Sequence, residues 1–158
     1  MKKPTLIALL LFVFTSFSAF SQGVWIEENW DWPINLHRTG KIQIHGEVHD
    51  LSNLGNNVNL SGANLKSANL KSANGSLCCA NLSNANLQHA IVPNLLSVNL
   101  EGADLRGLWG FGAKTFDEVN FTNSDLRDAS FWGAKFLMCS FDGANLAGVD
   151  FQDADLSG

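Results

Sequence analysis

A five-residue repeat occupies this chain from about Val58 to its last residue. Each unit places a small residue, then Asn or Asp, then Leu or Phe, as in Ala63-Asn64-Leu65 and Ala103-Asp104-Leu105. A fixed internal period constrains the architecture more strongly than any single residue does. Five residues match neither the period of about 3.6 of a helix nor the period of about 2 of a strand. The chain is therefore expected to turn a corner at every unit.

The motif resembles the consensus of the pentapeptide-repeat family, which is Ala, Asp or Asn, Leu or Phe, and two polar or small residues. The resemblance covers residues 58–158 and implies an all-β fold, a right-handed quadrilateral β-solenoid with four repeats in each coil. The residues themselves predict which side chains point inward. These are the Leu or Phe and the small residue two positions earlier, since no other positions are consistently apolar or small. Stacked coils, about 4.8 Å apart, then stabilise one another.

Residues 20 apart are expected to stack as columns in the longest unbroken run of repeats. The predicted columns of large residues are Phe111, Phe131 and Phe151; Phe121 and Phe141; Leu126 and Leu146; and Phe116, Phe136 and Leu156. The predicted small inward residues are Val119, Ser124, Ala129, Ala134, Cys139, Ala144, Val149 and Ala154. The recurring Asn and Asp residues are then part of the repeat scaffold, not a catalytic pair of carboxylates.

The spacing of five residues is interrupted three times, and insertions in repeat proteins usually form loops or bulges at one corner. The irregular intervals are seven residues (Leu70–Leu77), eight (Leu87–Leu95) and six (Leu105–Phe111). Gly75-Ser76 and Ala90-Ile91-Val92 are expected near the first two insertions.

The third interruption and one later tryptophan supply candidate contact residues. Trp109 and Lys114 fall where the period requires a small residue, so residues 107–115 are predicted to leave the regular path. Trp132 follows an inward Phe131 and is expected to point outward. Exposed tryptophans often anchor interfaces, so Trp109 and Trp132 are candidate interaction residues.

The first 21 residues resemble a secretory signal peptide. Lys2 and Lys3 precede an apolar stretch, residues 6–14, and Ala19-Phe20-Ser21 fits a cleavage site before Gln22. We expect an exported protein, periplasmic or secreted, with no stable membrane insertion after cleavage. An uncleaved anchor is the alternative. The remaining segments are residues 22–57, an expected N-terminal cap, and residues 58–158, the solenoid.

The charge balance argues against two kinds of partner. The whole chain carries a formal net charge of −5 at pH 7, and loss of Lys2 and Lys3 would make it more negative. Nucleic acids and anionic membrane surfaces are therefore not expected to bind. The last repeats contain four aspartates and no basic residue. They form either a solvated face or a docking face, and are Asp142, Asp150, Asp153 and Asp155.

Three cysteines are an odd number for an exported chain. Cys139 replaces Ala at an inward position and is expected to be an inert filler. Cys78 and Cys79 are expected at outward or corner positions, free or paired with another chain, because adjacent cysteines form a disulfide only under strain. The spacing does not indicate structural zinc.

The segment before the repeats is expected to cover the first coil. It contains Trp25, Trp30 and Trp32, and then Ile42 and Ile44 in an alternating stretch typical of a strand. A solenoid end exposes apolar side chains and unpaired backbone, and so requires a cap. An exposed aromatic patch for a glycan, a peptide or a membrane is the alternative.

A histidine cluster in this segment is the one group with metal-ligand residues. His45, Glu47 and His49 would share one face of a strand, with the two histidines about 13 Å apart. Without a bend at Gly46 one metal cannot reach both, so a polar strand face is favoured over a metal site. His37 and His89 are isolated and expected to be exposed.

No nucleophile motif or phosphate-binding loop is present, so we expect neither catalysis nor a cofactor. The leading hypothesis is a non-catalytic, exported interaction scaffold with a protein partner. Some pentapeptide-repeat proteins mimic DNA and bind type II topoisomerases, which is the second hypothesis. A purely structural envelope-associated rod is the third. Because the last residues, 156–158, lie within a repeat, an end-to-end homodimer through residues 141–158 is also expected.

Overall fold

The computed structural model describes residues 24–30, 38–45, 47–50, 54–70, 77–110, 112 and 114–158. Within these ranges the chain forms strands, isolated β-bridges, turns and bends, and no helix that could span a membrane. The named strands are β1 (Val24–Trp30), β2 (Arg38–Ile44), β3 (Glu47–Asp50), β4 (Leu95–Leu96), β5 (Thr115–Asp117) and β6 (Lys135–Leu137). The predicted all-β class is confirmed. His37 and the proposed signal peptide lie outside the described residues.

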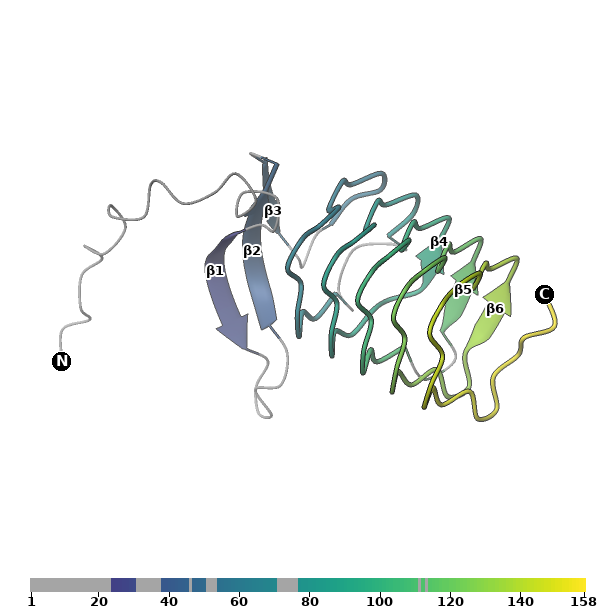
Figure 1. Ribbon diagram of the computed structural model, residues 1–158. Helices are drawn as coiled ribbons and strands as arrows, with labels where there is room; N and C mark the ends of the chain where they lie inside the picture. The colour runs from purple at the N-terminus through teal and green to yellow at the C-terminus, as the bar shows by residue number, and fades with distance from the viewer. Residues whose placement is uncertain are drawn as a thin grey trace.

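An antiparallel sheet in the order β1-β2-β3 stands at the N-terminal end of the solenoid (Figure 1). Ile42 of β2 is fully buried and belongs to the same apolar core as the coils. The His45 ring also lies 3.2 Å from the carbonyl oxygen of Ser61 in the first coil. This packing agrees with a capping role. The side chains of Ile44 and of Trp25, Trp30 and Trp32 lie outside what the structure describes.

The predicted strand face of His45, Glu47 and His49 is wrong. His45 lies in the turn between β2 and β3, with a φ of 51°, and β3 begins only at Glu47. The chain reverses there because β2 pairs antiparallel with β3, Ile44 facing Glu47. Within the described residues, no group of three His, Cys, Asp or Glu side chains could hold a metal ion.

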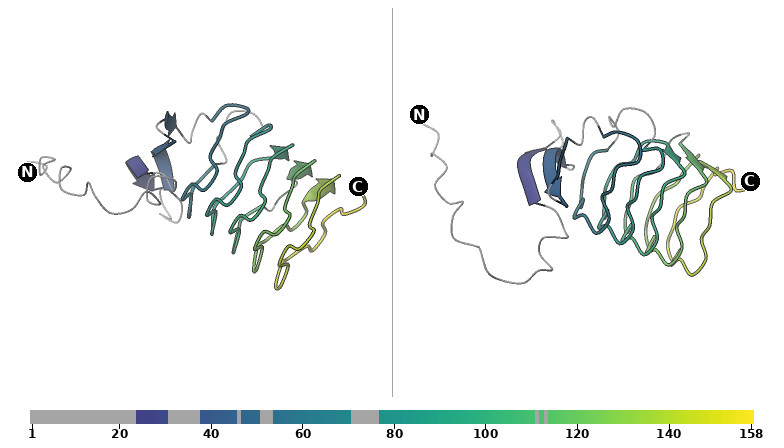
Figure 2. Two further views of the ribbon diagram at one scale, coloured as in Figure 1. Left: turned by 45° about the horizontal axis from the view of Figure 1, so that its top comes forward. Right: turned by 90° about the horizontal axis from the view of Figure 1, so that it is seen from above.

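The solenoid is held together by four columns of parallel pairing, which we name the first to fourth faces (Figure 2). The first face consists of Asn59, Asn81, Asn99, Asn120 and Ser140. The second face consists of Asn64, Asn86, Asp104, Asp125 and Asn145. The third face consists of Asn69, Ile91, Trp109, Ser130 and Asp150. The fourth face consists of β4, β5, β6 and Asp155.

The residue after each paired position points into the core, as does the residue before it. Leu65, Leu126 and Phe131 are fully buried, and so are Ala63 and Ala129 on the small side. This confirms the predicted inward pair of the repeat. The one buried polar residue in this part of the chain is Ser124, whose hydroxyl donates to the carbonyl oxygen of Phe121 at 2.7 Å. Ser124 therefore fills a small site without leaving an unpaired donor.

Asn and Asp recur in the paired positions because their side chains close the corners. Asp150 Oδ1 accepts the backbone N–H of Gln152 at 2.9 Å, two residues further along the chain. Such local bonds favour turns over continued strand. The same contact is made by Asn59, Asn64, Asn81, Asn86, Asn99, Asp104, Asn120, Asp125, Asn145 and Asp155. The scaffold role predicted for these residues is confirmed.

Phenylalanine rings fill the later coils. Phe121 stacks on Phe141 with ring centroids 4.8 Å apart, and Phe116 stacks on Phe136 at 4.9 Å. Phe131 stacks on Phe151 at 5.7 Å and meets Phe116 edge-on at 5.2 Å. The rings thus stack along each face and pack edge-to-face across the core, which are the two arrangements that aromatic pairs favour.

Gly110, and not Phe111, is the core residue that precedes Phe131 in its column, so that predicted column is wrong. The Gly110 N–H donates to the carbonyl oxygen of Ser130, which sets the register. A Cβ added to Gly110 would lie 2.7 Å from Phe131 Cδ1 and 2.9 Å from Phe116 Cζ. Glycine is required because these two rings already occupy the space. Phe111 lies outside the described residues.

All variation in coil length falls at one corner, between the third and fourth faces. Successive partners on the first face are 22, 18, 21 and 20 residues apart. The steps that differ are seven residues (Leu70–Leu77), three (Val92–Leu95) and six (Gly110–Phe116). Every other step between central residues of the described coils is five, as from Leu126 to Phe131.

Two predicted irregularities are corrected by this register. Ala90-Ile91-Val92 is a regular repeat, because Ile91 pairs with Asn69 and Trp109, and Val92 is buried. The irregular step follows it. Residues 107–110 also stay on the regular path, so Trp109 occupies an outward paired position and not a small inward one. Both errors arose because Val92 and Gly110 stand where Leu or Phe was expected.

Candidate functional site

Four of the six candidate interaction residues lie together on or beside the third face. Trp109 and Asp150 belong to this face, on either side of Ser130. Trp132 occupies the following turn, 47% exposed, and its indole Nε1 donates to Asp153 Oδ2 at 3.0 Å. The outward orientation predicted for Trp132 is confirmed. The turn thus links the exposed tryptophan to an acidic side chain of the next coil.

The other two candidates lie elsewhere. The carbonyl oxygen of Asp142 accepts the N–H of Asn123, at the corner that follows the first face. Asp155 belongs to the fourth face, where Lys135 Nζ lies 3.7 Å from its carboxylate and the Ser157 hydroxyl donates to it at 2.6 Å. The four C-terminal aspartates therefore do not form one docking face.

The third face differs from the first two in its outward side chains. The first and second faces carry Asn, Asp or Ser at every paired position of the described coils. The third face instead carries Ile91 and Trp109 in consecutive coils. We call Ile91, Trp109, Trp132, Asp150 and Asp153 the third-face patch. It combines apolar area with an acidic margin, as interfaces often combine an apolar centre with a polar rim.

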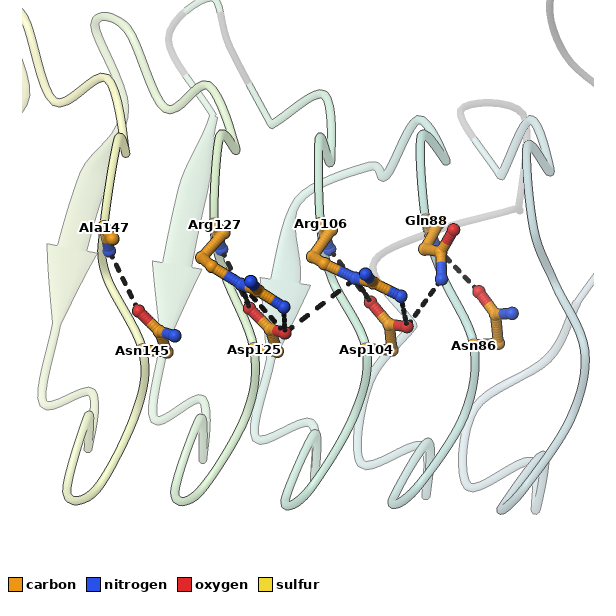
Figure 3. Close-up of polar contacts among 8 residues, drawn as sticks. All are labelled: Asn86, Gln88, Asp104, Arg106, Asp125, Arg127, Asn145 and Ala147. Carbon is orange, nitrogen blue, oxygen red and sulfur yellow. Dashed lines mark hydrogen bonds and ion pairs between the residues drawn. The ribbon is translucent and has the colours of Figure 1, made fainter.

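A ladder of paired charges on the second face was not predicted from the sequence. Arg106 donates to Asp104 through Nε at 2.8 Å and through a terminal nitrogen at 2.7 Å (Figure 3). Arg127 makes the same two-pronged contact with Asp125, at 2.9 and 2.6 Å. Gln88 donates to Asp104 at 2.6 Å. The sequence signal was the recurrence of Asp-Leu-Arg at residues 104–106 and 125–127.

The ladder also connects neighbouring coils. Arg106 Nε lies 3.8 Å from Asp125 Oδ2, so each carboxylate faces a guanidinium (Figure 3). The hydrogen bond with Arg106 lowers the pKa of Asp104 to about 2. The hydrogen bond with Arg127 likewise lowers the pKa of Asp125. The second face thus presents balanced charges and not a run of negative charge.

The C-terminal coil carries an apolar pocket. Leu146 is 39% exposed and Leu156 is 56% exposed, whereas the central residues of earlier coils are buried. The pocket is lined by Phe136, Cys139, Phe141, Leu146, Phe151, Leu156 and Gly158. Cys139 packs partly against the core, as its predicted filler role requires, and burial raises the pKa of its thiol.

Comparison with known proteins agrees with the geometry of the coils. The family model for pentapeptide repeats matches eight copies, over residues 56–74, 74–107, 115–136 and 124–158. The chain belongs to the pentapeptide-repeat family. A comparison with curated proteins found no match.

Solved pentapeptide-repeat structures resemble this family member. One is HetL of the cyanobacterium Nostoc sp. strain PCC 7120, a protein involved in the regulation of heterocyst differentiation. The two are 26% identical, with a TM-score of 0.50 over 66% of this chain and 58% of HetL. A protein of the Arabidopsis thaliana thylakoid lumen is 28% identical, with a TM-score of 0.46 over 66% of this chain and 69% of its own. Rfr23 of the cyanobacterium Cyanothece 51142 is 25% identical, with a TM-score of 0.31 over 63% and 61%.

Proposed function

We propose that this pentapeptide-repeat protein is an exported, non-catalytic scaffold that binds a protein partner through the third-face patch. The observation that carries the proposal is the replacement of Asn or Asp by Ile91 and Trp109 in the outward column of one face. Exposed Trp132 lies beside them. Tryptophan is enriched among the residues that dominate binding energy, and a stack of coils holds such residues at fixed spacing.

The margin of the patch defines the chemistry of the partner. Asp150 lies on the same face and Asp153 beside it, and the whole chain has a net charge of −5. We expect a protein surface with an apolar centre and Lys or Arg at its edge. Complementary charge would speed association and exclude acidic competitors, including nucleic acids. Raising the salt concentration should therefore slow association.

A pull-down from the native cell tests this proposal. The double variant Trp109→Ala/Trp132→Ala should lose a partner that the unchanged protein retains. The matched control is Met138→Ala, because Met138 is 69% exposed and follows β6 on the fourth face. Thermal melts of both variants exclude unfolding as the cause. Equal retention by the double variant and the control would contradict the third-face assignment.

Export rests on the N-terminal sequence. Mass spectrometry of the protein from its own cells should show a first residue at or near Gln22, in a non-cytoplasmic fraction. An intact Met1 on a cytoplasmic protein would contradict export. The structure favours the scaffold over a DNA mimic in one respect. Asp104 and Asp125 are paired with arginines, so the second face lacks a phosphate-like row of uncompensated charge.

The apolar C-terminal pocket supports the predicted homodimer. Contact between two copies would cover Leu146 and Leu156, which are the most exposed central residues of the described coils. The nearby aspartates oppose this contact by repulsion, so association should strengthen with salt. Analytical ultracentrifugation at low and high salt measures it. A monomer at high micromolar concentration in both buffers would contradict the homodimer.

A further inference from the structure

Two adjacent cysteines occupy a corner of the second described coil. Cys78 is partly buried and Cys79 exposed, both are free, and their Sγ atoms lie 3.1 Å apart. The backbone around them is fixed on both sides. The Asn57 N–H donates to the Cys78 carbonyl oxygen, and the Cys79 N–H donates to that of Leu96, each at 2.8 Å. The neighbouring coils therefore hold the two thiols at one turn.

A direct disulfide between these residues is disfavoured by the chain itself. Cα atoms of neighbouring residues lie about 3.8 Å apart across a trans peptide, below the range of about 4.4–6.8 Å found in disulfides. Cys79 is also set in a turn with a φ of 60° by its bond to the next coil. A bond between the sulfurs would need to bring them from 3.1 Å to about 2.05 Å. An atom inserted between them requires no such movement.

The distance between the sulfurs selects the geometry of that atom. Two bonds of about 2.3 Å, the length of a zinc–thiolate bond, span 3.1 Å at an angle of about 85°. A linear two-coordinate ion would need sulfurs about 4.6 Å apart. A tetrahedral ion prefers a wider angle and further ligands, and the described residues offer no third ligand of the His, Cys, Asp or Glu type. A pyramidal centre with angles near a right angle fits best.

We propose that Cys78 and Cys79 form a two-sulfur binding site for trivalent, thiophilic, pyramidal centres, such as a monosubstituted arsenical. The reaction is a condensation without electron transfer: R–As(OH)₂ and two S–H groups give R–As(S)₂ and two water molecules. Each sulfur forms one As–S bond, each As–O bond breaks, and each thiol proton leaves in water. The organic substituent completes the pyramid, so the site needs no further protein ligand.

The protonation of the pair suits this reaction. The hydrogen bond with Cys79 raises the pKa of Cys78, with smaller contributions from desolvation and from the neighbouring charge. Both S–H groups are then available to supply protons to the departing oxygens. Because the thiolate is the species that attacks a disulfide, a raised pKa also slows oxidation by exchange. The site is independent of the third-face patch.

Phenylarsine oxide, C₆H₅AsO, is a suitable probe, since it loses one water on binding two thiols. The full-length protein is reduced with a phosphine, freed of reductant without oxygen, and mixed with the probe. Intact mass spectrometry should show one phenylarsenic group bound. An excess of 2-mercaptoethanol should leave it in place, and 2,3-dimercaptopropanol should remove it. Chelation should make the affinity higher than that of one thiol by on the order of 100-fold.

Serine variants locate the site. Cys78→Ser and Cys79→Ser should each lose the adduct that resists 2-mercaptoethanol. Cys139→Ser should retain it, since that thiol packs against the core far along the chain. Coincident thermal melts show that the variants remain folded, as expected for changes at a surface turn. Retention of the resistant adduct by either of the first two variants, or its removal by 2-mercaptoethanol from the unchanged protein, would overturn the proposal.

Discussion

The coils before Gly110 and the coils after it follow the same path with different interiors. The earlier coils are filled by Leu and Ala, for example Leu65, Leu87 and Ala85. The later coils are filled largely by stacked phenylalanines. Backbone pairing is unchanged across the boundary, since Asp104 pairs with Asp125 as Asn86 pairs with Asp104. The solenoid therefore fixes the number and direction of inward side chains but not their volume.

Gly110 marks the boundary between these two interiors. Where aliphatic coils meet aromatic ones, an additional large side chain would overfill the core. The missing side chain of Gly110 provides the space that the Phe116 and Phe131 rings occupy. Volume is thus exchanged between neighbouring coils, consistent with the close packing of protein interiors. The comparison predicts that substitutions have the largest effects at the stacked rings, smaller ones at Gly110, and small ones outside.

Removal of a central ring should have the largest effect. Phe131 is fully buried and contacts Phe116, Phe121, Phe136 and Phe151. Phe131→Ala should lower the free energy of unfolding by about 3–5 kcal/mol, because it leaves a cavity. Urea melts measure this. Leu87→Ala, in an aliphatic coil, is the matched variant and should cost about 2–5 kcal/mol. A loss below about 1 kcal/mol for Phe131→Ala would show that the aromatic coils are not closely packed.

A side chain at the boundary should destabilise by overpacking. Gly110→Ala places a Cβ within 3 Å of two rings, so we expect a loss of about 1–3 kcal/mol in the free energy of unfolding. Gly55→Ala is the control, because a Cβ there meets no atom within 4 Å. In combination with Phe131→Leu, the cost of Gly110→Ala should fall, since the smaller side chain leaves room. Strict additivity of the two changes would argue against shared space.

The ladder on the second face should add a smaller, pH-dependent contribution. Asp104 has a pKa of about 2 when folded and 3.8 as its ordinary value. Its stabilisation is therefore present above pH 4 and is lost as the pH falls toward 2. The side chains are 30 to 43% exposed, so we expect less than about 1 kcal/mol. Urea melts at pH 7 and below pH 3 should show a smaller loss for Asp104→Asn than for the unchanged protein.

Asp104→Asn separates charge from turn chemistry, because Asn86 and Asn145 occupy the same position in neighbouring coils and close the same corner. Unchanged pH dependence in this variant would assign the acid sensitivity to other carboxylates. Asp125, whose pKa is also lowered, is the next to test.

The smallest effect on stability is expected outside the core. Trp132 is 47% exposed, and its printed polar contact is one hydrogen bond to an exposed Asp153. Trp132→Ala should change the free energy of unfolding by about 0.5 kcal/mol or less, as exposed substitutions usually do. A larger loss than that of Phe131→Ala would reverse the assignment of inside and outside. Paired urea melts decide the order.

The repeat allowed the inward and outward positions to be predicted because a period of five ties every side chain to a fixed direction. The stacks of Phe121 on Phe141 and of Phe116 on Phe136 followed directly. Two central positions were missed because Val92 and Gly110 do not match the motif. Without the coil lengths, the residues that face each other across coils could not be deduced.

The same limitation applies to the candidate surfaces. Trp109 and Trp132 were predicted as contacts from their residue type, but Ile91 was not, because it was assigned to an insertion. The pairing of Arg106 with Asp125 depends on a coil of 21 residues, and no local motif specifies that number. Local hydrogen bonds, such as that of Asp150 with Gln152, could be read from the repeat, whereas contacts between coils required the structure.

The concentration of all length changes at one corner has a consequence for how such a chain can be altered. Residues gained or lost between the third and fourth faces leave the remaining steps of the described coils at five. One residue gained anywhere else would turn every later core side chain toward the solvent until the register recovered. This corner is therefore the natural graft site for a foreign peptide, and a similar insertion after Leu65 or Leu126 should prevent folding.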